Sequence, residues 1–155
     1  MVFTTHKESE TENLGRRLAL AARSTPLVVC LLGDLGAGKT VFVRGMAKAF
    51  GFAGRVTSPT FAIVNEYNNA QGKPVLLHFD MYRLSSSEEL YDIGWYDYLE
   101  MGAAIAVEWA EKVMDAMPEN AVFVAIEGAG MGPRTITLTG LSKEEELLLE
   151  KGCTP

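Results

Sequence analysis

A glycine-rich segment directly after an apolar run constrains this chain more than any other feature. Leu27-Val-Val-Cys-Leu-Leu32 is followed by Gly33-Asp-Leu-Gly-Ala-Gly-Lys39-Thr40. The apolar run is partly β-branched and is typical of a strand buried on both faces of a parallel sheet. The spacing G-x-x-x-x-G-K-[ST] is the pattern of a phosphate-binding loop that opens a helix. Apolar residues from Phe42 to Phe50 then recur at helical spacing, so the chain supplies the strand–loop–helix context that the motif requires.

The motif predicts how a nucleotide would be held. Its glycines let backbone N–H groups turn toward phosphates, and the N-terminus of the following helix adds a partial positive charge. Lys39 is predicted to reach the β- and γ-phosphates, and Thr40 to give its hydroxyl oxygen to Mg²⁺. An accidental glycine-rich turn is disfavoured by the flanking strand and helix. The predicted cofactors are therefore ATP or ADP with Mg²⁺, bound by Asp34, Leu35, Gly36, Ala37, Gly38, Lys39, Thr40 and Val41.

Two acidic residues stand at the ends of other predicted strands. Asp80 follows the run Val75–Phe79, and Glu108 follows the run Ala103–Val107. Both are expected at the carboxyl edge of the sheet, where open α/β folds bind ligands. A phosphate-binding loop needs an acidic residue there to hold or organise magnesium. We predict that both carboxylates are functional, the alternative being an ordinary solvated residue at a strand end, and the residues alone leave open which one contacts the metal.

Four further positions have two interpretations each. The loop from Thr57 to Thr60 occupies the place of a switch loop that senses the γ-phosphate, or is a proline turn capped by hydroxyls. His78 is interpreted as a half-buried strand residue rather than a catalytic base. Arg83 either neutralises charge in the transition state or pairs with a nearby carboxylate. Trp109 either shields the nucleotide or anchors the helix expected after it.

The motifs that the chain lacks narrow the choice of nucleotide and reaction. No Asn-Lys-x-Asp segment is present to read guanine, and no Asp-x-x-Gly follows a strand, so adenine is favoured. No arginine-rich lid segment of a nucleotide kinase is visible either. An ATP hydrolase is the preferred hypothesis, with a small-molecule kinase and a nucleotide-gated binding module as the alternatives.

Alternating strands and helices predict an α/β fold. We expect a P-loop NTPase-like three-layer sandwich with a mixed, centrally parallel sheet and a β-hairpin, formed by residues 1–155 as a single domain. The hairpin joins strands Phe61–Tyr67 and Val75–Phe79 through the turn Asn68–Gly72. The other expected elements are a helix over about residues 10–23 opened by a capping box at Ser9–Glu12, a helix opened by a capping box at Ser85–Glu88, a helix near Gly94–Leu99, a helix over Trp109–Met117, strands Val122–Ile126 and Thr135–Leu138, and a short charged helix and tail over about 142–155 opened by Ser142–Glu145.

Charge and hydropathy indicate where such a chain acts. The 14 Lys and Arg residues against 20 Asp and Glu residues give a formal net charge of −6. Such a surface is poorly suited to hold a polyanion, so contact with RNA is expected through partners. The longest apolar run, Leu27–Leu32, is far short of the roughly 20 residues that cross a bilayer. Cys30 and Cys153 lack the spacing of a zinc or redox site, and a cytoplasmic protein with no membrane association is predicted.

Four ordered segments together resemble the TsaE (YjeE) family. They are Gly33–Thr40, Thr57–Phe61, His78–Leu84 and Val107–Trp109, and the likeness extends from about residue 5 to 140. The first segment is generic, whereas the joint occurrence of all four is specific. The resemblance implies the ATPase that supports threonylcarbamoyladenosine formation in tRNA. It also implies two partners, TsaD, which transfers the threonylcarbamoyl group, and TsaB, which scaffolds the complex, with tRNA reached indirectly.

The resemblance also implies roles for individual residues. Lys39 and Asp80 are the implied catalytic residues, Asp80 as an essential acid that orients the attacking water. Thr40 and Glu108 are the implied magnesium ligands. Thr60 would lie in the switch-like loop and Trp109 would border the nucleotide. Val41 departs from relatives that carry a second Thr, which should leave magnesium binding intact. Slow intrinsic turnover that partners stimulate is expected, because the sequence positions no arginine finger or glutamine.

Overall fold

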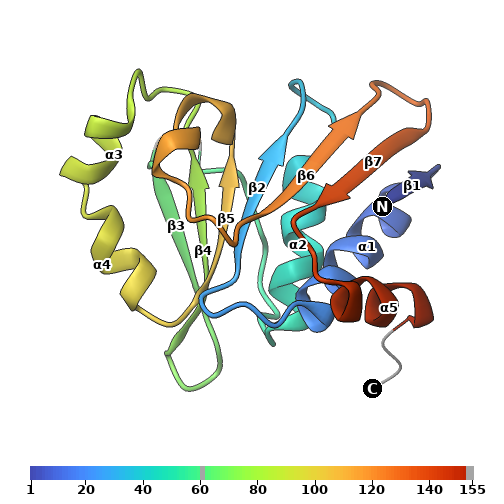
Figure 1. Cartoon of the computed structure of the whole chain (residues 1–155), viewed down its shortest axis with the longest axis horizontal. Helices are drawn as coiled ribbons and strands as arrows, with labels where there is room; N and C mark the ends of the chain where they lie inside the picture. The colour runs from blue at the N-terminus through green and yellow to red at the C-terminus, as the bar shows by residue number, and fades with distance from the viewer. Residues whose placement is uncertain (60–61, 153–155) are drawn as a thin grey trace.

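A mixed seven-stranded sheet runs through the computed structural model, which describes residues 1–59 and 62–152 (Figure 1). The strands lie in the order β1-β7-β6-β2-β5-β4-β3. Strands β6, β2, β5 and β4 form a parallel centre, whereas β3, β7 and β1 pair antiparallel toward the two edges. The predicted mixed sheet with a β3–β4 hairpin is thus confirmed. The strands are β1 (Val2–Thr5), β2 (Val28–Leu32), β3 (Val64–Asn68), β4 (Pro74–Asp80), β5 (Ala104–Glu108), β6 (Val122–Glu127) and β7 (Arg134–Thr139).

Helices cover both faces of this sheet. One apolar cluster joins it to α1, α2 and α5, and a second joins the opposite face to α3, α4 and the short 3₁₀ helices η1 and η2. This is the predicted three-layer arrangement. Within residues 1–59 and 62–152, no helix combines the length and apolarity needed to cross a membrane. The helices are α1 (Glu8–Ala21), α2 (Lys39–Ala49), α3 (Ser87–Asp92), α4 (Trp95–Glu100), η1 (Ala110–Lys112), η2 (Met114–Ala116) and α5 (Lys143–Lys151).

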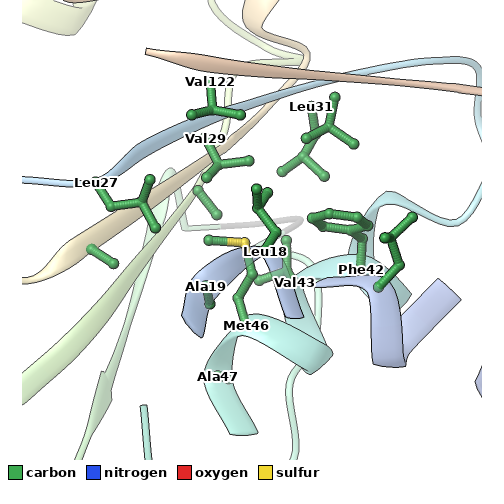
Figure 2. Packing of buried hydrophobic residues seen from close by; sticks show 14 of the residues in the cluster. Leu18, Ala19, Leu27, Val29, Leu31, Phe42, Val43, Met46, Ala47 and Val122 are labelled. Atoms are coloured by element: carbon green, nitrogen blue, oxygen red, sulfur yellow. The ribbon is translucent and has the colours of Figure 1, made fainter. Parts of the chain in front are cut away.

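Strand β2 shows why its sequence is apolar without interruption. Side chains alternate between the faces of a strand, and both faces here are covered. Val29 and Leu31 contribute to the cluster with Leu18 of α1 and Phe42 of α2 (Figure 2). Cys30 contributes to the opposite cluster, where burial raises the pKa of its thiol to about 12. Cys30 is therefore an inert core thiol, and the carboxyl end of β2 is held rigidly where the glycine-rich loop begins.

The start of α1 differs from the prediction. The helix begins at Glu8 with Lys7 as its N-cap, and no side chain of the N-cap accepts a hydrogen bond. The capping box predicted at Ser9–Glu12 is therefore wrong. The carboxylate of Glu10 accepts instead from the backbone N–H of His6 at 2.7 Å, which stabilises an earlier start.

The two capping boxes predicted further along have opposite outcomes. The box at Ser85–Glu88 is wrong, because α3 has Ser86 as its N-cap without a side-chain hydrogen bond. The neighbouring hydroxyl of Ser87 donates to the carboxylate of Asp115 in η2. The box at Ser142 is confirmed, since Ser142 Oγ accepts from the Glu145 N–H at 3.3 Å and Ser142 N–H donates to the Glu145 carboxylate at 2.8 Å.

The helix predicted over Trp109–Met117 is also wrong, because η1 and η2 replace it. Trp109 has a left-handed backbone, with φ 59° and ψ 38°, which an α-helix does not accommodate. Ala110 and Val113 are both buried, and a spacing of three matches the repeat of a 3₁₀ turn.

The remaining differences between prediction and structure concern the strands at the two edges of the sheet. Strand β1 was not predicted, and it pairs with β7 through Val2 opposite Thr137. The strand predicted over Phe61–Tyr67 begins at Val64. Thr60, which ends the predicted switch loop, and Phe61, the first residue of the predicted strand, lie outside the described residues.

Candidate nucleotide-binding site

A cavity of about 910 Å³ opens at the carboxyl edge of the central strands. Its size is in the range of small-molecule sites. Four parts of the chain surround it: the β2–α2 loop, the ends of β4 and β5, the β1–α1 turn, and the β6–β7 loop. Ser58 also lines it, together with Thr5, His6, Lys7, Glu8, Thr11, Leu35, Gly36, Ala37, Gly38, Lys39, Thr40, Val41, Asp80, Tyr82, Glu108, Trp109, Gly130, Met131, Gly132 and Arg134.

The β2–α2 loop has a backbone that only glycine accommodates easily. Gly33, Gly36 and Gly38 have φ values of +139°, +79° and +114°. A side chain at Gly33 would overlap the carbonyl oxygen of Ile126 on β6, so this glycine also allows the loop to lie against the sheet. Helix α2 starts immediately afterwards, and the N–H groups of its first turn have no partner within the helix. The loop therefore fits an anion such as a phosphate.

Lys39, the first residue of α2, is buried at the floor of the cavity. Its ammonium donates to the carbonyl of Gly33 at 2.5 Å and to that of Asp34 at 3.0 Å. The Nζ atom also lies 4.1 Å from the centroid of the Trp109 ring. Burial lowers the pKa of Lys39, and the negative charge of nearby carboxylates, first that of Glu108, opposes this shift. Loop, carboxylate and ring thus fix one cation at the point where phosphates would enter.

Thr40, Glu108 and His78 form the polar centre of the site. The Thr40 hydroxyl donates to Glu108 Oε1 at 2.8 Å, and His78 Nε2 lies 2.8 Å from the same oxygen. His78 is fully buried, not half-buried as predicted, and Glu108 is also buried. The contact between the two residues was not predicted, and it arises because their strands β4 and β5 are neighbours in the parallel centre.

Asp80 is directly opposite Glu108 in the β4–β5 register. Its carboxylate accepts from Ser58 Oγ at 2.9 Å and from the backbone N–H of Tyr82 at 2.9 Å. The first hydrogen bond connects this carboxylate to the loop of residues 56–59, which precedes β3. The structure therefore brings both predicted carboxylates to one edge and connects one of them to the predicted switch loop.

The donor set at this edge fits magnesium. Residues 1–59 and 62–152 contain no group of three or more His, Cys, Asp or Glu side chains arranged for a metal. Mg²⁺ does not need one, since it retains waters and combines one or two protein oxygens with substrate phosphates. Thr40 and Glu108 supply such oxygens side by side, next to the phosphate-binding loop.

Arg134 is a site residue that no sequence motif indicated. Its guanidinium donates to the carbonyl of Ala37 at 2.8 Å, that of Gly130 at 3.0 Å and that of Gly132 at 2.6 Å. These bonds connect the phosphate-binding loop to the β6–β7 loop. On the same side of the cavity, the Thr5 and Thr11 hydroxyls are 2.7 Å apart and join β1 to α1.

The comparison with known proteins identifies the family. A family model described as "Threonylcarbamoyl adenosine biosynthesis protein TsaE" matches residues 5–136. The chain belongs to the TsaE family.

Individual TsaE relatives match most of the chain. The Bacillus subtilis protein named "tRNA threonylcarbamoyladenosine biosynthesis protein TsaE" is 36% identical over 149 residues, covering 96% of this chain and 91% of the relative. The protein of the same name from Streptomyces coelicolor is 39% identical over 136 residues, or 84% and 90% of the two chains. The crystal structure of Bacillus subtilis YdiB has a TM-score of 0.72 and 32% identity, covering 97% of this chain and 92% of YdiB.

Most residues predicted for a TsaE site, Trp109 included, line this one cavity. Asp34 is not among the lining residues, and it takes part through the carbonyl that accepts from Lys39. Arg83 is exposed and does not line the cavity, although it follows Asp80 closely. Trp109 is half-buried beside Lys39. The roles of these residues in binding and catalysis stay predictions.

Proposed function

We propose that this TsaE family member binds and hydrolyses ATP with Mg²⁺ as a subunit required for threonylcarbamoyladenosine modification of tRNA in the cytoplasm, together with TsaD and TsaB. One observation carries the ATPase proposal: Thr40 Oγ1 lies 2.8 Å from Glu108 Oε1, next to the buried Lys39 of a phosphate-binding loop. The proposed role in threonylcarbamoyladenosine modification is supported by the names of the relatives.

The proposed binding mode uses both walls of the cavity. Backbone N–H groups of residues 35–41 bind the phosphates, and Lys39 neutralises the β- and γ-phosphate oxygens. Thr40 and Glu108 hold the magnesium, which when bound spreads the negative charge of the phosphates. The β1–α1 turn and the β6–β7 loop line the remaining wall, so we propose that the adenosine lies between them.

Asp80 is proposed to orient the attacking water. Ser58 Oγ and the Tyr82 N–H fix the rotation of its carboxylate, so that one lone pair can accept from a water in a constant direction. Beyond Lys39, the lining cations are Lys7 on the β1–α1 turn and Arg134, whose guanidinium is held in place by backbone carbonyls of the two loops. Slow intrinsic turnover follows, since a free arginine is a common source of acceleration in such sites.

Partners are proposed to complete the site at its rim. Leu35 and Met131, two of the most exposed large apolar side chains at 88% and 101%, both line the cavity. A protein that bound over the cavity would remove these apolar surfaces from water, which is favourable. A partner bound there would cover the nucleotide and would be able to contribute a charged group to it.

The test is ATP hydrolysis by the protein alone and with TsaB and TsaD, in the presence and absence of Mg²⁺. We expect slow release of phosphate alone and faster release with both partners. Lys39→Ala should reduce both rates by roughly 100-fold or more. Lys143→Ala removes an equal charge from a residue that is 96% exposed on α5 and should change neither rate. Wild-type rates in the Lys39→Ala variant, or phosphate transfer to a small-molecule alcohol in place of water, would contradict the proposal.

A further inference from the structure

A line of hydrogen bonds runs from the 56–59 loop to the proposed magnesium pair. The carbonyl of Thr57 accepts from the Tyr67 hydroxyl at 2.9 Å, and the N–H of Thr57 donates to the same hydroxyl at 3.3 Å. The Tyr67 oxygen lies 3.4 Å from His78 Nδ1. His78 Nε2 lies 2.8 Å from Glu108 Oε1, which also accepts from Thr40.

The middle of this line is shielded from water. Tyr67, His78 and Glu108 are 5%, 0% and 4% exposed. The β3–β4 and β4–β5 registers place the three side chains on the sheet face that carries α2. Burial raises the pKa of Tyr67, so its hydroxyl remains a donor over the ordinary pH range. Buried hydrogen bonds of this kind restrict their members to a few arrangements.

The hydrogen-bond donors and acceptors along this line determine which acceptor the Tyr67 hydroxyl can use. Because Glu108 Oε1 is the acceptor of the Thr40 hydroxyl, we assign the imidazole N–H of His78 to Nε2, which faces the same oxygen, and in that tautomer Nδ1 is an acceptor toward Tyr67. The single O–H of Tyr67 therefore has two competing acceptors, the Thr57 carbonyl at 2.9 Å and His78 Nδ1 at 3.4 Å. When Thr57 moves away, the O–H can turn to His78 and hold the imidazole against Glu108.

We propose that Tyr67 and His78 are positioning residues that couple the 56–59 loop to the Thr40–Glu108 magnesium pair. This inference rests on the proposed function. A second arm supports it, because Ser58 of the same loop donates to Asp80. Coupling of this kind is reciprocal, so loop arrangement affects magnesium affinity and bound magnesium affects the loop. The chemistry of the reaction is unchanged, since neither residue contacts the nucleotide in this scheme.

The first test is Tyr67→Phe, which removes one oxygen atom and retains the ring. The affinity of the full chain for ADP and for a non-hydrolysable ATP analogue is measured by calorimetry with and without Mg²⁺. The ratio of the nucleotide affinity with Mg²⁺ to that without Mg²⁺ should fall about 2- to 10-fold in this variant, which is the range for the loss of one hydrogen bond. The nucleotide affinity without Mg²⁺ should be unchanged. Tyr98→Phe is the matched control, because Tyr98 contacts Phe79 on the opposite face of the sheet.

The second test compares two amides at position 78. A glutamine amide extends about as far as Nε2 and keeps a donor for Glu108, whereas an asparagine amide extends only about as far as Nδ1. We expect His78→Asn to reduce the Mg²⁺-dependent gain roughly 10- to 100-fold, as for other outer partners of metal ligands, and His78→Gln to restore part of it. A purely structural role would lower both affinities together and would show no such rescue.

The outcomes separate this inference from the proposed function. If wild type binds Mg²⁺–nucleotide and the Tyr67→Phe and His78→Asn variants retain its full Mg²⁺-dependent gain, the coupling is overturned and the ATPase proposal stands. Equal losses with and without Mg²⁺ would also overturn it. If wild type binds no nucleotide at all, the proposed function fails and the coupling fails with it.

Discussion

Trp109 combines an unfavourable backbone with a favourable environment. Its φ of 59° is rare for a residue with a side chain and costs on the order of 1 kcal/mol. The indole ring lies over the Lys39 ammonium and 5.1 Å from the Tyr82 ring. Such conformations persist where surrounding contacts enforce them, and they concentrate at functional sites. The residue directly after Glu108 is thereby held with its ring facing the phosphate-binding loop.

This position makes Trp109 a reporter of nucleotide binding. The chain has two tryptophans, and Trp95 is fully buried in the other apolar cluster, where its N–H donates to the Ala116 carbonyl. We expect intrinsic fluorescence to change when Mg²⁺–ATP is added, because phosphates alter the charge beneath the Trp109 ring. Trp109→Phe should lose the signal and bind ATP about 2- to 5-fold more weakly, because the weaker cation–π contact of a phenyl ring holds the Lys39 ammonium less firmly in position for the phosphates. Trp95→Phe should retain the signal. Loss of the fluorescence change in this variant would show that Trp95, and not Trp109, reports nucleotide binding.

At the scale of elements, two glycines set the distance between α1 and α2. A side chain at Gly15 would overlap the carbonyl oxygen of Phe42, and one at Gly45 would overlap that of Glu12. The helix backbones therefore lie in direct contact. The arrangement matters for the site, since α2 starts with Lys39 and α1 follows the turn that lines the opposite wall.

Gly45→Ala should separate these helices. Alanine favours a helix by about 1 kcal/mol over glycine, but overlap with the α1 backbone should outweigh that gain. We expect a net loss of about 2 kcal/mol in the free energy of unfolding, measured by urea denaturation. Gly132→Ala is the control, since its added carbon would meet the Ala129 carbonyl oxygen at an ordinary 3.5 Å. Equal stability of Gly45→Ala and wild type would show that the helices can move apart freely.

The central strands could be predicted from the sequence, whereas strand β1 and the 3₁₀ turns after β5 could not. Strands β2 and β5 are continuous apolar runs because both of their faces are covered, and this signal is local. Strand β1 has only four residues, of which only Thr5 is buried, and its partner β7 lies at the other end of the chain. After β5, the spacing of Ala110 and Val113 suits an α-helix or a 3₁₀ turn, and the backbone of Trp109 decides between them.

The two walls of the candidate site also differ in how well the sequence predicts them. The phosphate-binding wall is one contiguous motif whose residue types follow from its chemistry, so it could be predicted. The opposite wall is assembled from two segments far apart in sequence, and residues such as Arg134 and Thr11 have no diagnostic spacing. The contact between His78 and Glu108 has no signal in the sequence, because only the β4–β5 register brings the two side chains together.

At the scale of the whole molecule, charge limits what the protein does alone. The formal net charge of −6 is distributed over a small chain, and affinity for nucleic acid backbone depends on released counterions and thus on Lys and Arg. Its proposed role in tRNA modification therefore requires partners that contact the tRNA. In this scheme the chain contributes nucleotide turnover, and TsaD and TsaB contribute RNA recognition.

The corresponding prediction concerns tRNA binding by the isolated protein. At about 0.15 M salt, where the Debye length is about 8 Å, we expect no measurable binding of fluorescently labelled tRNA by anisotropy at micromolar protein. Addition of TsaD and TsaB should produce binding that weakens steeply with salt, because their phosphate contacts release counterions. The same titration with Lys39→Ala should give an unchanged salt dependence, since that lysine is buried in the cavity and is not available to RNA. Tight binding of tRNA by the isolated chain would mean that a local basic surface overrides the net charge, and the division of labour between the subunits would have to be revised.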